Sequence, residues 1–188
     1  GHFQWTRLEI ASPIQDAIRL GYSHRYEFVQ TPFENLAVPV GRFHFDEALL
    51  QFKFSKNRWI GGEVFVGAGS FFDGTRTRAR ADLSFRFSKF LQTSLVYSIN
   101  DIRLPGGDDL IHLLSTRFSV LFTPDISWIT LVQFDNVSDS IGINSRLRWI
   151  IEDGREVFLV LNQGLDTSHG IEAGRTAPLI KLQWTFRF

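Results

Sequence analysis

The chain contains no cysteine, and none of its apolar runs is long. Without cysteine it forms no disulfide, offers no thiolate ligand to zinc and has no thiol nucleophile. No stretch approaches the roughly 18 consecutive apolar residues that a membrane helix requires. The sequence therefore excludes a helical membrane protein. It still allows a β-barrel, which needs only alternate residues to be apolar because its strands satisfy one another's backbone groups.

Methionine is also absent, even from position 1, and the opening residues GHFQWTRLEI show no basic segment followed by an apolar one, as a secretory signal would. We therefore expect a processed or truncated chain that once had more sequence in front of it. The formal net charge is zero, so the overall charge gives no reason to expect nucleic acid as a partner.

Aromatic residues are abundant, with 19 Phe and 5 Trp, yet the mean hydropathy is -0.04. Apolar residues must therefore alternate with polar ones. The last residues, IKLQWTFRF (180–188), place Ile, Leu, Trp and two Phe on one face of a strand and Lys, Gln, Thr and Arg on the other. Such a strand resembles the closing strand of a bacterial outer-membrane β-barrel, whose final aromatic residue, here Phe188, is the usual mark for the barrel-assembly machinery.

The same alternation recurs with turn residues every 12 to 17 positions, the rhythm of antiparallel strands. We predict an all-β protein in which residues 1–188 form one antiparallel transmembrane β-barrel domain. Single-chain bacterial barrels usually have even strand counts. About eleven strands therefore favour the C-terminal part of a larger barrel, or a weak first strand outside the wall. The predicted strands are residues 3–11, 17–30, 42–54, 58–71, 75–88, 90–101, 110–122, 126–136, 140–151, 156–165 and 177–188.

The clearest strand reads TRTRARADLSFRF (75–87), with its arginines on one face and Thr, Ala, Leu and Phe on the other. A row of arginines needs water, whereas the apolar row needs lipid or a core. In strand 42–54 the phase changes, since Phe43 and Phe45 are out of step with the later apolar residues. This predicts a bulge near residues 46 and 47, or a strand that rises above the bilayer.

The connections between the predicted strands alternate in length. In outer-membrane barrels the short turns face the periplasm and the long loops face outward, so the final strand should run inward to a periplasmic C-terminus. The short connections are SPIQD, SKNR, SKF, TPDIS and EDGR, and the longer ones, rich in Pro, Gly and Asp, are 31–41, 102–109 and 166–176.

Several segments are more specific than alternation, above all LPGGD (104–108) and NSRLRW (144–149). They belong to segment 99–150, as do Gln133 and Phe134, and this segment together with segments 26–47, 70–88 and 157–167 resembles the C-terminal barrel region of a bacterial outer-membrane family, domain of unknown function 5916. The resemblance covers most of the chain from residue 17 onward. It implies a large membrane barrel preceded by a periplasmic domain similar to family 9 carbohydrate-binding modules. Nothing in this chain resembles that domain, so the resemblance does not bring sugar binding with it.

On the polar face, summed over the predicted strands, twelve cations oppose five anions although the chain as a whole is neutral. We expect this face to line a lumen. One alternative is an interior whose arginines are all paired with carboxylates, so that no solute passes. The other is a pore or vestibule that favours anionic solutes, because a ring of cations lowers the barrier for anions. The basic residues are Arg19, Arg25, Lys53, Arg76, Arg78, Arg80, Arg86, Arg117, Arg146, Arg148, Lys181 and Arg187, and the acidic ones are Glu27, Glu47, Glu63, Asp82 and Asp135.

Large aromatic residues lie near the ends of the predicted strands, where an amphipathic ring suits the headgroup level of a membrane. A soluble β-sandwich also uses large aromatics in its core. The predicted strands of 10 to 14 residues favour the barrel, since globular strands usually have about five or six. The expected interface residues are Trp59, Trp128, Trp149, Trp184 and Phe188, and Trp5 also lies near a strand end.

The sequence offers only weak candidates for a metal-binding or catalytic site. Asp108 and Asp109 follow a Gly pair, which reads as a solvated turn more than as a calcium site. The five histidines show no zinc-like spacing. The stretch from Asp166 to His169 contains triad residue types, but adjacent residues in one loop rarely hold triad geometry. We expect no metal, no cofactor and no enzymatic activity.

The sequence thus predicts a porin-like wall in the bacterial outer membrane, in contact with lipid and lipopolysaccharide, that passes or binds anionic solutes. The alternative is a structural barrel that anchors a periplasmic or surface protein, or the missing N-terminal part of the same polypeptide. A membrane-embedded hydrolase is the third hypothesis.

Overall fold

The computed structural model describes residues 3–30 and 40–185, and there the chain is all-β. None of the described residues belongs to a helix that could cross a bilayer. The strands are β1 (Phe3–Ala11), β2 (Ala17–Val29), β3 (Gly41–Phe54), β4 (Ile60–Phe71), β5 (Gly74–Arg86), β6 (Leu91–Leu104), β7 (Gly107–Leu121), β8 (Ile126–Asp135), β9 (Ser140–Glu152), β10 (Arg155–Asp166) and β11 (Glu172–Trp184).

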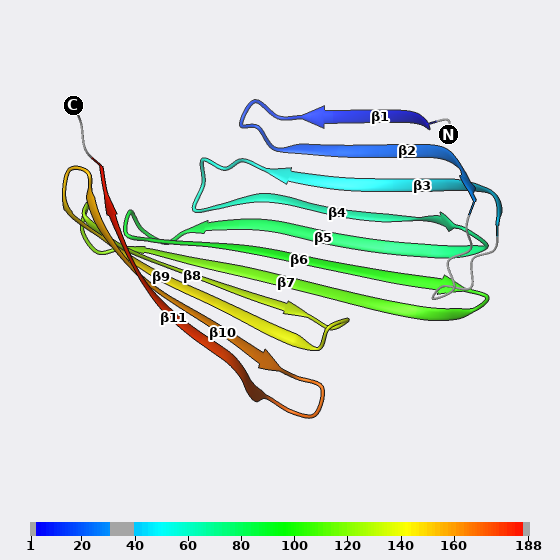
Figure 1. The fold of residues 1–188 in the computed structure, drawn as a ribbon. Helices are drawn as coiled ribbons and strands as arrows, with labels where there is room; N and C mark the ends of the chain where they lie inside the picture. The colour runs from blue at the N-terminus through cyan, green and yellow to red at the C-terminus, as the bar shows by residue number, and fades with distance from the viewer. Residues whose placement is uncertain (1–2, 31–39, 186–188) are drawn as a thin grey trace. The chain divides into compact units, whose positions relative to one another are not determined.

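The strands form one antiparallel sheet in which their order follows the chain from β1 to β11 (Figure 1). This confirms the prediction of an all-β fold with eleven antiparallel strands. The order begins at β1 and ends at β11, so the sheet of described residues is open and has two edges. An edge strand presents unpaired N–H and C=O groups, which need water or another strand.

The predicted alternation of short and long connections was wrong. The expected loop 102–109 is a two-residue turn, Pro105–Gly106, and β11 begins at Glu172, which shortens the expected loop 166–176. Polar and Gly-rich segments such as Asp108–Asp109 continue the strand ladder instead, because their side chains are exposed on both faces of β7. The turn geometry predicted after Pro105 is confirmed.

Alternate connections lie at the same end of an antiparallel sheet. We call the end with connections 12–16, 55–59, 87–90, 122–125 and 153–154 the Trp end. The loop end is the end with connections 30–40, 72–73, 105–106, 136–139 and 167–171.

Contacts divide the sheet into two compact parts. The first part comprises residues 1–57, 61–83 and 97–112, and the second comprises residues 58–60, 84–96 and 113–188.

In the first part the strand register separates an apolar face from a charged face. Ile18 pairs with Phe52 across β2 and β3, and Phe52 pairs with Val64 on β4, so all three lie on the apolar face. Arg19 and Lys53 alternate with these residues and lie on the charged face. The alternation predicted from the sequence therefore sorts the side chains here.

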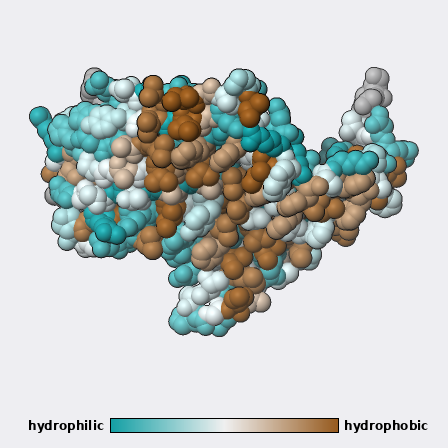
Figure 2. Space-filling view, turned by 180° about the vertical axis from the view of Figure 1, so that it is seen from behind, coloured by the Kyte–Doolittle hydropathy of each residue, from teal (hydrophilic) through white to brown (hydrophobic). Residues whose placement is uncertain are grey.

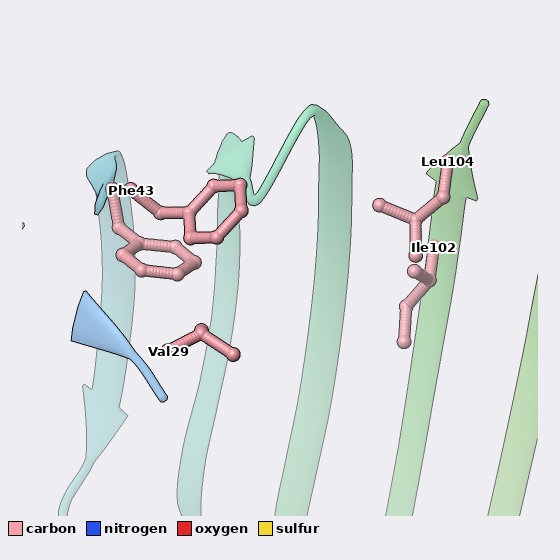
Figure 3. Packing of buried hydrophobic residues seen from close by; sticks show 5 residues of the cluster. Val29, Phe43, Ile102 and Leu104 are labelled. Atoms are coloured by element: carbon pink, nitrogen blue, oxygen red, sulfur yellow. The ribbon is translucent and has the colours of Figure 1, made fainter. Parts of the chain in front are cut away.

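The faces exchange character at the loop end of the first part. The charged face there carries the buried apolar cluster of Val29, Phe43, Phe45, Ile102 and Leu104, against which Phe71, Phe72 and Ile111 pack. Ile102 and Leu104 of β6 point toward Val29 and Phe43 (Figure 3). β3 stays in continuous register with β2 from Gly41 to Lys53, so the predicted bulge does not cause the phase change. Phe43 and Phe45 leave the apolar face because they pack in this cluster.

The opposite face at the loop end is polar. The carboxylate of Asp46 accepts hydrogen bonds from the Tyr22 hydroxyl and from His24, whose Nδ1 lies 2.7 Å away. The backbone N–H of Asp46 donates to Ser70 Oγ at 2.7 Å, and the His24 and His44 rings stack at 5.7 Å. A polar patch thus continues the apolar face toward the loop end.

In the second part the apolar face is formed by cross-strand rows. One row joins Trp128, Leu147, Leu159 and Ile180 across β8 to β11. The other face is mixed, because Arg146 and Arg148 share it with Val160 and Leu179. Apolar residues form broad areas of the exposed surface in Figure 2.

Gly62 gives a stability test of this packing. Its φ is 138°, a conformation that L side chains rarely adopt, and a Cβ would collide with the backbone carbonyl oxygen of Asp82. We predict that Gly62→Ala lowers the free energy of unfolding by more than about 1 kcal/mol, measured by urea unfolding with Trp fluorescence. The control is Gly142→Ala, where a Cβ meets no atom within 4 Å. Equal stability of the two variants would contradict the close approach of Gly62 to Asp82.

Candidate functional site

The charged face is the candidate site, because it gathers most of the residues predicted to line a lumen. In the first part it carries Arg19, Arg25, Glu27, Glu47, Lys53, Glu63, Arg76, Arg78, Arg80 and Asp82. In the second part it carries Arg117, Asp135, Arg146, Arg148 and Lys181, with Arg86 at the end of β5. Arg187 lies outside the described residues.

Among the ion-paired carboxylates of the described residues, Glu47 is the most enclosed, with its side chain 13% exposed. Arg78 binds it in a fork, with Nε 2.6 Å from Oε1 and one terminal nitrogen 2.8 Å from Oε2. Arg76 lies 3.6 Å from the same carboxylate and also covers the Phe71 ring at 4.6 Å. One carboxylate therefore neutralises part of the charge of two neighbouring arginines.

A second polar row crosses the first four strands. Arg19 donates to Glu9 on β1 at 3.3 Å and to the Gln51 side-chain oxygen on β3 at 3.2 Å. Gln51 in turn donates to Glu63 on β4 at 3.0 Å. Together with the Glu47 site, this row ties the charged face of the first part together by hydrogen bonds.

Three carboxylates of the charged face were missed by the sequence reasoning: Glu9, Glu156 and Asp166. Glu156 binds Arg148 in a fork, at 2.5 and 2.9 Å. The alternation of Arg7 and Glu9 with Leu8 and Ile10 could have revealed the first. On β10 both faces carry apolar residues, so alternation alone could not assign Glu156. The charged face therefore holds more acids than the sequence reasoning counted, and Arg7 adds one further cation to it.

Three cations of the second part differ from most of those of the first. Among the described residues, no carboxylate lies within ion-pair distance of Arg117, Arg146 or Lys181. Arg146 and Lys181 instead approach the same Phe158 ring, at 5.7 and 5.8 Å from its centroid. Lys53 of the first part also lacks an ion pair among the described residues, so positive charge remains available to a solute in both parts, most of it in the second.

Among the predicted interface aromatics, Trp128, Trp149 and Trp184 lie on the apolar face close to the Trp end. Trp59 lies in the connection before β4 and is 64% exposed. The last residue named for this role and for assembly, Phe188, lies outside the described residues. Trp5 differs from the rest, because its ring lies on the charged face over Gly21, where a Cβ would come within 2.7 Å of it.

The stretch from Asp166 to His169 does not have the order of a catalytic triad. Ser168 donates its hydroxyl, at 2.5 Å, and its backbone N–H, at 2.9 Å, to Asp166. His169 Nδ1 lies 3.0 Å from the Ser168 hydroxyl. The serine therefore lies between acid and histidine, whereas a triad needs the histidine in the middle.

Within the part of the chain that the structure describes, no group of three or more His, Cys, Asp or Glu could hold a metal ion. Asp108 and Asp109 are exposed on β7.

No known protein-family model matches the chain, and no curated protein matches it. The likeness of segments such as 144–149 to an outer-membrane family thus stays a prediction from the sequence.

Glu47 and Glu27 provide a matched pair for testing the charged face. We predict that Glu47→Gln lowers the free energy of unfolding by on the order of 1 to 3 kcal/mol, because two partly buried arginines lose their anion. Glu27→Gln should cost less than about 0.5 kcal/mol, since Arg25 lies 4.0 Å away and both side chains are about half exposed. Urea unfolding followed by Trp fluorescence measures both. Similar losses for the two variants would refute the special role of Glu47.

Proposed function

We propose that this chain is a membrane-embedded wall of a bacterial outer-membrane β-barrel, whose charged face lines a hydrated lumen and contacts anionic solutes. The observation that carries the proposal is the apolar face, whose large side chains are exposed. Ile10, Ile180 and Leu182 are 68%, 69% and 75% exposed. Exposed apolar surface of this extent marks contact with lipid or a protein partner.

The second part also offers a place for a lipid chain on this face. An open hollow of about 500 Å³ is lined by apolar side chains, including Trp128, Leu147, Leu159, Pro178 and Ile180. Its shape and polarity suit an acyl chain.

The height of the apolar band supports a bilayer. On β6 the apolar face runs from Leu91 to Ile99 before Asp101 and Arg103 begin, a rise of about 27 Å along the strand. A strand tilted by about 40° would cover about 21 Å of bilayer with this band, close to the apolar band of about 25 Å in outer-membrane barrels. The strands of 9 to 15 residues are long enough for this role.

The exchange of faces at the loop end of the first part supports the same proposal. A face in lipid must be apolar, whereas the same face above the bilayer meets water and can carry Asp46, His24 and His44. The buried cluster around Phe43 would then lie inside a rim that stands beyond the hydrocarbon layer. This arrangement is the strand rising above the bilayer that the phase change in β3 predicted.

A soluble β-sandwich is the competing architecture, and it needs a second sheet packed on the apolar face. No second sheet occurs among the described residues, which form one sheet.

The charge pairing favours two roles for the charged face. In the first part, the Glu47 site and the Arg19 row pair most of the charged side chains with one another, as in a wall with a structural role. Arg117, Arg146 and Lys181 of the second part are unpaired among the described residues, as is Lys53 of the first part. A barrel that anchors a partner protein is therefore the second candidate function, and we propose no catalytic role.

Brominated lipids test the insertion of the apolar face. In variants that keep one Trp and replace the other four with Phe, we predict strong quenching of Trp149 by lipids brominated near the headgroup. Trp5 should be quenched far less, because its ring lies on the charged face. The measurement is fluorescence in vesicles with and without bromine. Equal quenching of Trp149 and Trp5, or none of either, would refute the membrane wall.

The absence of cysteine allows a second test, which locates the outer edge of the lipid layer on β3. We predict that His44→Cys reacts with a water-soluble maleimide in vesicles at least about tenfold faster than Leu50→Cys. The two positions share one face of one strand, but only Leu50 lies in the apolar band. Both cysteines should react alike after unfolding in urea, which is the control. Equal rates in vesicles would place the edge elsewhere.

A further inference from the structure

Two cations and an aromatic ring converge on the charged face of the second part. Lys181 is the cross-strand neighbour of Phe158, and Arg146 pairs with Val160 two residues farther along β10. Both side chains are exposed, and both approach the Phe158 ring within 6 Å. An aromatic face attracts each cation by about 0.5–1 kcal/mol at an exposed site. That attraction positions each cation beside the ring without neutralising it.

The acids of this face are already engaged. Glu156 is bound by Arg148, Asp166 by Ser168, and Asp135 accepts the backbone N–H of Val137 at 2.8 Å. Each of these carboxylates is thus bound by a nearby residue and does not pair with Arg146 or Lys181. An external anion is therefore the natural counter-charge for Arg146 and Lys181.

Hydrogen-bonding groups continue from this pair toward the loop end. Asn144 lies two residues from Arg146 on the same face of β9, and its amide donates to the Asn162 side chain on β10. Arg117 lies in the same cross-strand row as Asn144, through Leu131, so their Cα atoms are about 10 Å apart. Long side chains can bridge that distance.

The sheet is hollowed beside these amides. Gly142 and Gly164 pair across β9 and β10, and a Cβ at Gly142 would meet no atom within 4 Å. The hollow has a volume of about 450 Å³, and its polar lining is Gln133, Asn144, Asn162, Gln163 and Arg175. It is large enough for the uncharged remainder of a small solute.

We propose that Arg146 and Lys181, assisted by Arg117, bind an oxyanion, the phosphate or carboxylate group of an elongated solute that extends along β9 and β10 toward the Gly142–Gly164 hollow. Arginine offers paired N–H donors that match such groups, and lysine adds a point charge. This site deepens the proposed function and rests on it for the direction from which solute arrives. It also places the proposed anion contact in the second part of the charged face.

The test is binding of inorganic phosphate and of succinate to the folded protein in detergent micelles, followed by phosphorus NMR line broadening and by calorimetry at constant ionic strength in chloride. We expect at least one oxyanion to bind, and the Arg146→Ala, Lys181→Ala double variant to weaken its affinity at least tenfold. Arg117→Ala should weaken it less. Arg80→Gln is the matched control, because Arg80 is already paired with Asp82 at 2.7 Å, and it should bind like the parent protein.

The outcomes separate this site from the membrane wall. Absence of binding of either oxyanion, or equal loss in Arg80→Gln and in the double variant, overturns the site, whatever the lipid quenching of Trp149 shows. Binding that the double variant loses, in a protein whose Trp149 is not quenched by lipid, sustains the site and refutes the wall. Unchanged Trp fluorescence and urea midpoint in the double variant show that a lost affinity is not lost folding.

Discussion

The pleat of a long β-strand is the constraint on which this structure depends. Successive side chains must point to opposite faces, so a strand of 13 residues such as β5 delivers about six side chains to each side. Antiparallel pairing in register carries the same division across neighbouring strands, as from Ile18 to Phe52 to Val64. The sheet thus acquires one face that water solvates poorly and one that needs water. Any environment for the protein has to satisfy both faces at once.

Such a sheet cannot bury its apolar face by itself. The stable solutions for a two-faced sheet are a second layer or closure upon itself. Both edges of the described sheet add unpaired backbone groups to the same problem. A bilayer around a closed barrel removes the exposed apolar side chains and the edges together, which is why one proposal accounts for both features.

Much of the fold could be predicted from the sequence, because alternation is a direct consequence of the pleat. All eleven strands lie near the predicted residues, and the faces of β5 follow the alternation of Arg with Ala and Phe. The connection lengths could not be predicted, since Asp108 and Asp109 are turn formers by composition but are tolerated in an exposed strand end. The sequence also could not predict that Phe43 and Phe45 pack in the buried cluster of the first part. A phase change in the pattern does not say whether the backbone or the environment has changed.

The charged face was predicted in membership but not in its internal pairing. Alternation places Arg78 and Glu47 on one face, whereas only the register of β3, β4 and β5 brings them within 2.6 Å. Pairing across strands depends on which residues share a row, and a shift of two residues in one hairpin would change every partner. Charge counts made from the sequence therefore overstate the field of a sheet.

The distribution of the unpaired charge has a physical consequence. An arginine held in a fork by a carboxylate, like Arg78 or Arg148, presents little net charge to a solute and mainly stiffens the sheet. Arg146 and Lys181 instead make cation–π contacts with Phe158, and these contacts leave their charge intact. An aromatic ring fixes the position of a cation without neutralising it, whereas a carboxylate fixes and neutralises it together. A cation held by an aromatic ring is better suited to reversible anion binding, because it is positioned and still charged before the anion arrives.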